Sequence, residues 1–120
     1  MTVTMAQTVG SNVLEIGLGG TLTTADCEAV SRQIERMLRE HLRLRLFVSV
    51  TRVVAFAGCW DDVQYDAKRF KLVERVAMVG EPRWNAEMAA FAKAFPKAAI
   101  EYFPPNRAAE ARGWITEVAG

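Results

Sequence analysis

The run from Val73 to Val79 constrains the fold of this chain more than any other stretch. Its residues are apolar except for Glu74 and Arg75, and the run has the length of a strand. An apolar run of this length between turn signals is typical of an inner strand in a sheet that helices cover. Gly80 allows a tight turn after it, and Pro82 suits the first turn of a helix because the N–H that proline lacks has no helical partner there. The sequence therefore predicts a buried strand that leads directly into a helix.

The rest of the chain alternates between segments with the period of a strand and segments with the period of a helix. Alternating residues predict strands over residues 2–9, 13–18, 43–50 and 98–103. Apolar stripes at spacings of three and four predict helices over residues 24–41, 60–70 and 82–94. A closing helix is expected to bury Ala108, Ala111, Ile115 and Val118.

This order predicts one α/β domain over residues 1–120, with a mostly parallel β-sheet and right-handed crossovers. The turn cluster Gly10-Ser11-Asn12 predicts that the first two strands pair as an N-terminal hairpin. We expect Thr23 or Thr24 to cap the first helix and Asn106 to cap the last.

The strands also carry a pattern that predicts how the helices are distributed. Each strand has one face that is nearly free of charge and one face that carries a charge, so we expect helices to crowd over the first face and to cover the second less. The charges expected on the less covered face are those of Glu15, Arg45, Arg75 and Glu101. Opposite charges on neighbouring strands of that face can pair.

Composition excludes several classes of function. Of the 120 residues 51% are hydrophobic, and the net charge is +1, so the chain lacks the electrostatic footprint of a nucleic-acid-binding protein. No apolar run approaches the roughly 20 residues of a membrane helix, and the first residues lack the pattern of a signal peptide. We therefore expect a cytoplasmic protein without integral membrane contact.

No cofactor motif or metal site stands out. The glycines at 17, 19 and 20 fail the dinucleotide fingerprint, because its third glycine would have to stand where Leu22 stands. His41, the only histidine, closes a helix, where a cation is favoured by the helix dipole. Asp62 and Asp66 are four residues apart, but without a third ligand nearby they are better explained by the start of a helix. We expect no catalytic residues, metal or cofactor.

The two cysteines, Cys27 and Cys59, form neither a CxxC pair nor a disulfide framework. Acyl-transfer chemistry needs a nucleophile beside a base, and Cys59 with His41 is the only such combination that the sequence offers. Nothing in their spacing brings the two side chains together.

One set of residues matches a known family in spacing over roughly residues 10–118. It consists of Trp60-Asp61-Asp62 with Asp66 and Phe70, of Glu74 to Gly80, of Trp84, and of Ile100 to Phe103 leading to Ala111 and Trp114. In these residues the chain resembles the SpoIIAA-like proteins, which are relatives of the STAS and Sec14 (CRAL-TRIO) domains. The resemblance implies a superhelical βα sandwich. It also implies a regulatory or ligand-sensing module rather than an enzyme, while Sec14 relatives bind lipids.

One departure from STAS proteins matters for mechanism. STAS anti-sigma-factor antagonists carry a phosphorylatable serine in an Asp-x-Ser-Gly loop, whereas the matching loop here is Phe56-Ala57-Gly58-Cys59-Trp60, without a hydroxyl. The phospho-serine switch therefore does not carry over to this chain.

An uncharged stretch over residues 53–59 predicts a binding surface. Loops are usually polar, and ligands of open α/β sheets bind outside the carboxyl ends of the strands. We expect an apolar lip at that edge, formed by Leu22, Phe56, Trp60 and Trp84. The lip would hold a small apolar ligand, a protein partner or a second copy of the chain in a homodimer. The alternative for Trp60 and Trp84 is that each simply caps the core from the first turn of its helix.

The sequence thus predicts a non-enzymatic binding or regulatory module. Two other functions stay open: a structural homo-oligomer with no ligand, and a hydrolase or transferase that uses Cys59.

Overall fold

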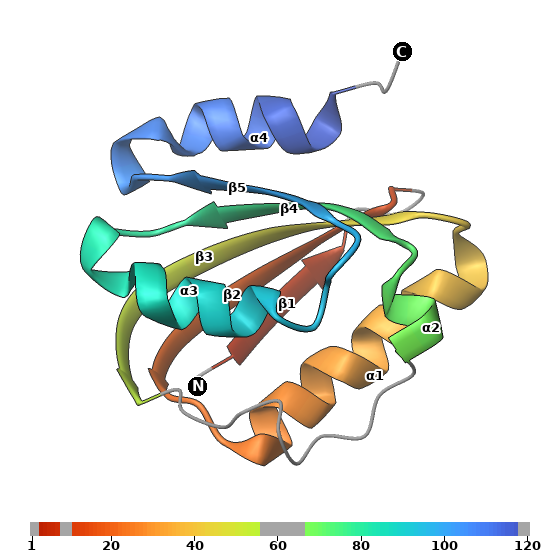
Figure 1. Ribbon diagram of the computed structural model, residues 1–120, viewed down its shortest axis with the longest axis horizontal. Coiled ribbons are helices and arrows are strands. Elements are labelled where there is room, and N and C mark those ends of the chain that lie inside the picture. The colour runs from red at the N-terminus through yellow and green to blue at the C-terminus, as the bar shows by residue number, and fades with distance from the viewer. Residues whose placement is uncertain (1–2, 8–10, 56–66, 118–120) are drawn as a thin grey trace.

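Five strands form one sheet, in the order in which they occur along the chain (Figure 1). The computed structural model describes residues 3–7, 11–55 and 67–117. The strands are β1 (Val3–Gln7), β2 (Val13–Thr21), β3 (Leu44–Ala55), β4 (Val73–Val79) and β5 (Ala99–Phe103). β1 pairs with β2 antiparallel, and the other neighbours pair parallel. This arrangement confirms the predicted α/β class, the mostly parallel sheet and the N-terminal hairpin.

The helices lie unequally on the two faces of the sheet (Figure 1). Helices α1 (Thr24–Glu40), α2 (Ala67–Phe70) and α3 (Asn85–Ala92) cover one face, while α4 (Ala108–Thr116) lies on the other. Short 3₁₀ turns, η1 (Pro82–Trp84) and η2 (Pro105–Arg107), precede α3 and α4. Because the parallel strands are added in sequence order, right-handed crossovers place every connecting helix on the same face. The predicted crowding of one face is therefore correct.

Local sequence signals account for the start of α1 but only in part for that of α4. Thr23 caps α1 in a capping box, since its side chain accepts from the Asp26 N–H while the Asp26 carboxylate accepts from the Thr23 N–H. The predicted cap at Asn106 is wrong, because Asn106 lies inside η2 and the N-cap of α4 is Arg107, without a capping side chain. The physical reason is Pro105, whose fixed φ starts a helical turn one residue before Asn106.

Strand β3 is longer than its alternation predicts. The expected strand over residues 43–50 continues to Ala55, so residues 53–55 of the predicted uncharged loop belong to the sheet. Thr51 and Arg52 interrupt the apolar alternation of the sequence, but the backbone continues to pair with β2 around irregularities in register.

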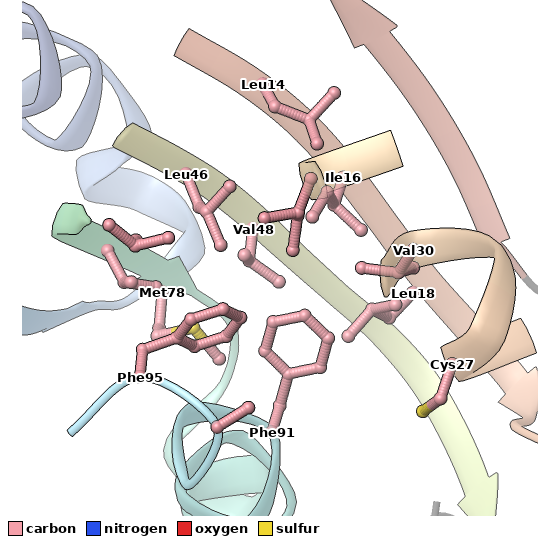
Figure 2. Close-up of a cluster of buried hydrophobic side chains, with 14 of the residues drawn as sticks. Leu14, Ile16, Leu18, Cys27, Val30, Leu46, Val48, Met78, Phe91 and Phe95 are labelled. Carbon is pink, nitrogen blue, oxygen red and sulfur yellow. The ribbon is translucent and has the colours of Figure 1, made fainter. Parts of the chain in front are cut away.

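The larger core fills the space between the sheet and the three helices (Figure 2). Phe70, Phe91 and Phe95 meet beneath β3 and β4, with ring centres 5.4 Å apart for Phe70 and Phe95 and 5.7 Å apart for Phe91 and Phe95. Phe91 of the helix predicted over residues 82–94 and Phe95 just after it are therefore part of the core. Strand and helix side chains that surround it include Leu14, Ile16, Leu18, Val30, Leu46, Val48 and Met78.

The smaller core lies under α4. Ala111 and Ile115 of α4 pack on Phe47, Ala77, Val79 and Phe103 of the sheet. The helix lies mostly over β4 and β3, with fewer neighbours in β5. The part of this face formed by β1 and β2 is therefore less covered.

The four predicted charges do lie on the face of α4, as strand register shows. Glu15 is the Cα partner of Phe47, Arg45 is that of Arg75, and Glu101 is that of Ala77. Arg75 reaches this face because a bulge at Glu74 shifts the register between β3 and β4.

The expectation of a less covered position is wrong for Arg45. It is only 7% exposed, because the C-terminal end of α4 covers it. It also pairs with Glu74, at 2.7 Å, rather than with a charge of the predicted set.

Arginines of two neighbouring strands hold the C-terminal end of α4. Nη1 of Arg45 donates to the carbonyl of Ile115 at 2.9 Å and to that of Glu117. Nη1 of Arg75 donates to the carbonyl of Trp114 at 2.8 Å, and its guanidinium lies 5.1 Å from the centre of the Trp114 ring. The last carbonyls of a helix lack helical partners and carry its negative dipole end, so cationic donors stabilise α4 here.

We predict that Arg45→Met lowers the free energy of unfolding by about 3 kcal/mol, since hydrogen bonds to charged groups contribute about 1.5–3 kcal/mol each. Methionine keeps much of the apolar stem but leaves Glu74 and two helix carbonyls without this donor. Urea denaturation followed by circular dichroism measures the change.

The matched control is Arg107→Gln, at the other end of α4, where Arg107 forms an exposed ion pair with Glu110. Its effect should stay within about 0.5 kcal/mol. Equal urea midpoints for the two variants would contradict the anchoring role of Arg45.

Two glycines should respond to alanine in opposite directions. Gly20 has a φ of 68°, where an alanine costs about 1–2 kcal/mol, so Gly20→Ala should destabilise the protein. Gly113 lies within α4 with open space where an alanine Cβ would stand, so Gly113→Ala should stabilise it by about 0.5–1 kcal/mol. Thermal unfolding of both variants beside the wild type shows whether each one is more or less stable. A stabilising effect of Gly20→Ala would refute the prediction for Gly20.

Candidate functional site

The carboxyl ends of β2 to β5 meet at one edge of the sheet, where the sequence predicts the apolar lip. Leu22 directly follows β2 and is buried in the larger core. Trp84 ends η1, is half-buried and packs against the same core. Phe56 and Trp60 lie outside the described residues. Leu22 and Trp84 thus pack into the same large core, and part of Trp84 stays accessible.

Arg83 contacts the accessible indole of Trp84. Its guanidinium lies 5.0 Å from the centre of the Trp84 ring, and its Nε pairs with Glu81 at 2.9 Å. Both partners of that ion pair are exposed, so it holds Arg83 only weakly over the ring.

The β2–β3 pair is distorted at the same edge. Leu18 is paired with Val50, Gly20 with Val53, and Thr21 with Ala55, so β3 gains an extra residue at two successive steps. Arg52, between the first two of these pairs, has a φ of 37°, in the left-handed region that non-glycine residues rarely adopt. Bulges of this kind bend a strand and change the direction of its side chains, and they occur often beside functional sites.

A second concave surface lies on the opposite face, between α4 and β2. This α4 groove has a volume of about 300 Å³. Its apolar lining comes from Val13, Phe47 and Ile115, and the hydroxyl residues Ser11 and Thr116 also line it. No motif in the sequence predicts this groove, because its two walls are far apart in the chain.

An ion pair spans the α4 groove. Nη1 of Arg112 lies 2.8 Å from Oε1 of Glu15, and the Arg112 guanidinium lies 4.4 Å from the centre of the Phe47 ring. Phe47 is only 3% exposed, whereas the side chains of Arg112 and Glu15 are 59% and 38% exposed. Solvent therefore reaches both charges, whereas the Phe47 ring beneath them is covered. The sequence signal that could have indicated this site is Glu15, a lone acid on an otherwise uncharged strand.

A neighbouring depression of about 320 Å³ continues the α4 groove toward the end of the helix. It shares Ser11, Val13, Ile115 and Thr116 with the groove and adds Arg45, Asn12 and Glu117 to the lining. Nε and Nη1 of Arg45 already donate there to Glu74 and to the carbonyls of Ile115 and Glu117.

The two residues whose pKa values are shifted, Arg107 and Glu110, lie outside the α4 groove. The Arg107 hydrogen bond lowers the pKa of Glu110, and the same bond raises the pKa of Arg107. Both side chains are exposed on α4, so the shifts reflect a surface ion pair.

Asp62 and Asp66, the acidic pair considered for a metal, lie outside the described residues. His41 is the C-cap of α1, where its backbone N–H donates to the carbonyl of Met37. Within the described ranges, no three His, Cys, Asp or Glu side chains gather closely enough to hold a metal ion.

Cys27 is disulfide-bonded, which contradicts the expectation that the cysteines form no disulfide. Cys59, the other cysteine of the sequence, lies outside the described residues. Spacing along the chain carries no information on the Cα distance and direction that a disulfide requires, which is why the expectation failed.

In the part of the chain that the structure describes, no helix has both the length and the apolar character needed to cross a membrane.

Comparison with known proteins agrees with the fold. The chain is similar to the crystal structure of an uncharacterized protein of the DUF3478 family with a SpoIIAA-like fold, from Shewanella loihica PV-4. The two are 22% identical, with a TM-score of 0.62 over 94% of this chain and 91% of that one, and at this identity the likeness supports the fold alone. No curated protein matches the sequence. The family model described as SpoIIAA-like matches residues 13–116, from the start of β2 to the end of α4. The chain therefore belongs to the SpoIIAA-like family.

Proposed function

We propose that the protein is a cytoplasmic, non-enzymatic binding or regulatory module that holds a small apolar ligand or a protein partner at the apolar lip near residues 53–60. The observation that carries this proposal is the distortion of β2 and β3 at Gly20 and Arg52, where the two strands approach the lip. A non-glycine residue held in the left-handed region costs free energy, and such residues cluster at functional sites.

The position and chemistry of the edge support the same proposal. Ligands of open α/β sheets bind outside the carboxyl ends of the strands, and Leu22 and Trp84 follow the carboxyl ends of β2 and β4. The exposed pair of Arg83 and Glu81 could move away from the indole of Trp84 at little cost, which would uncover apolar surface for a ligand.

The mechanism proposed is binding without phosphorylation. The stretch from Phe56 to Trp60 contains no hydroxyl group, so a phospho-serine switch at this loop has no acceptor. The signal would instead be occupancy of the lip by a ligand or a partner.

A structural homo-oligomer without a ligand is the second candidate. The observation that favours it is the exposure of large apolar side chains on both edge strands, Met5 on β1 and Tyr102 on β5. Edge strands present unpaired backbone groups that can pair with another chain. A homodimer formed in this way would leave the lip free.

We predict that Phe56→Asp disrupts ligand binding or self-association at the lip while the protein stays folded. A carboxylate placed in an apolar contact surface must be desolvated when the partner binds, which opposes association. Native mass spectrometry of freshly purified protein shows both the oligomer and any small molecule that co-purifies. Circular dichroism verifies that the variant is folded.

The matched control is Leu42→Asp, because Leu42 is 88% exposed in the turn between α1 and β3, away from the lip. The control should keep the wild-type mass spectrum. If Phe56→Asp unfolds the chain, Phe56 belongs to the core and the proposal fails. If it keeps the wild-type assembly and co-purifying molecule, the lip is not the binding surface, and loss of the oligomer on Tyr102→Asp would then favour the edge-strand dimer.

A further inference from the structure

We propose that the α4 groove binds a small zwitterion with an apolar body, of the class of branched-chain and aromatic α-amino acids. This site is separate from the lip. It lies on the face of the sheet that α4 covers, and its wall includes Val13 at the amino end of β2, whereas the lip lies at the carboxyl ends of the strands.

The charges of the groove complement a zwitterion. Glu15 presents a carboxylate and Arg112 a guanidinium, with 2.8 Å between the nearest atoms. In an α-amino acid the ammonium and the carboxylate are joined through a single carbon, so its two charges also lie close together. The ligand ammonium would donate to Glu15, and the ligand carboxylate would accept from Arg112.

Both protein groups retain the capacity for these bonds. Their ion pair uses Oε1 of the carboxylate and Nη1 of the guanidinium. A carboxylate offers about four acceptor sites and a guanidinium about five N–H donors, so one contact leaves most of that capacity unused. Their exposure also means that a ligand replaces water at these groups rather than a buried partner.

The lining of the groove selects for an apolar body. Val13 is half-buried and contributes apolar surface beside the charges, and Phe47 and Ile115 lie beneath that surface, 3% and 1% exposed. Arg112 lies over Phe47, and a guanidinium that rotates toward a ligand carboxylate would open the ring to an apolar side chain. A volume of about 300 Å³ is at the lower end of the range for ligand pockets, about 300–1,000 Å³, which suits a ligand as small as an amino acid.

Leucine and its two singly charged analogues provide the direct test. Isothermal titration calorimetry would compare L-leucine and L-phenylalanine with 4-methylpentanoate, which lacks the ammonium, and with 3-methylbutylamine, which lacks the carboxylate. We expect both amino acids to bind and each analogue to bind at least about tenfold more weakly, because one charge-assisted hydrogen bond is lost. Backbone amide shifts in NMR spectra should change at Val13, Glu15 and Phe47.

Single variants assign each charge of the ligand to its partner. Glu15→Gln should weaken leucine binding at least about tenfold but leave 4-methylpentanoate unaffected, whereas Arg112→Gln should weaken both. Arg107→Gln removes a similar exposed ion pair from the same helix and should bind leucine like the wild type. Thermal unfolding verifies that each variant is folded, and the comparison of analogues on the wild-type protein does not depend on any variant.

Three results would overturn the inference. One is the absence of heat and of amide shifts with either amino acid at millimolar concentration. Another is equal binding of leucine and 4-methylpentanoate, which would mean that Glu15 recognises nothing. The third is a set of shifts around Leu22 and Trp84 instead of the groove, which would assign the amino acid to the lip and support the proposed function without this site.

Discussion

The right-handed crossovers of a parallel sheet whose strands are added in sequence order determine most of what this molecule can do. They place α1, α2 and α3 on one face, where the larger core forms. The other face of a parallel sheet must also be covered, and among the described residues α4 is the helix that lies on it. One helix cannot cover five strands. The concave surfaces and accessible charges of this face therefore follow from the topology rather than from any local motif.

The sheet holds α4 by polar groups as much as by apolar contact. The fully buried side chains that α4 contributes are Ala111 and Ile115, and Trp114 packs beside them only partly buried. Arg45 and Arg75 therefore carry part of the attachment, by satisfying carbonyls that the end of a helix leaves without partners. A buried arginine is costly unless it is paired, and Glu74 together with the helix carbonyls supplies that pairing. Arg45 thus specifies where α4 ends on the sheet.

The fold could be predicted from the sequence to a large extent, and the sites much less. The strand from Val73 to Val79 occurs over the predicted residues, because its apolar run and its turn signals are both local. The positions of Glu15, Arg45 and Glu101 on the α4 face were also predictable, since alternation fixes the face of each side chain, whereas Arg75 reaches this face through a bulge. Their partners were not: Glu15 meets Arg112 only because α4 folds back over the sheet, and no spacing in the sequence determines that path. The bulge at Glu74 likewise depends on register with β3.

Anchoring of α4 and occupancy of the α4 groove are linked, because α4 supplies one wall of the groove. Arg112 and Ile115 line the groove, and Ile115 also accepts a hydrogen bond from Arg45. A ligand that binds only when α4 is docked must stabilise the docked state, by an amount that grows with the ratio of its concentration to its dissociation constant. Weakening the Arg45 anchor lowers ligand affinity only in proportion to the fraction of molecules in which α4 stays docked, since the ligand binds that state alone. Arg45 touches α4 but has no need to touch the ligand. It can therefore influence affinity only through the position of the helix, whereas Glu15 and Arg112 would influence it through direct contact.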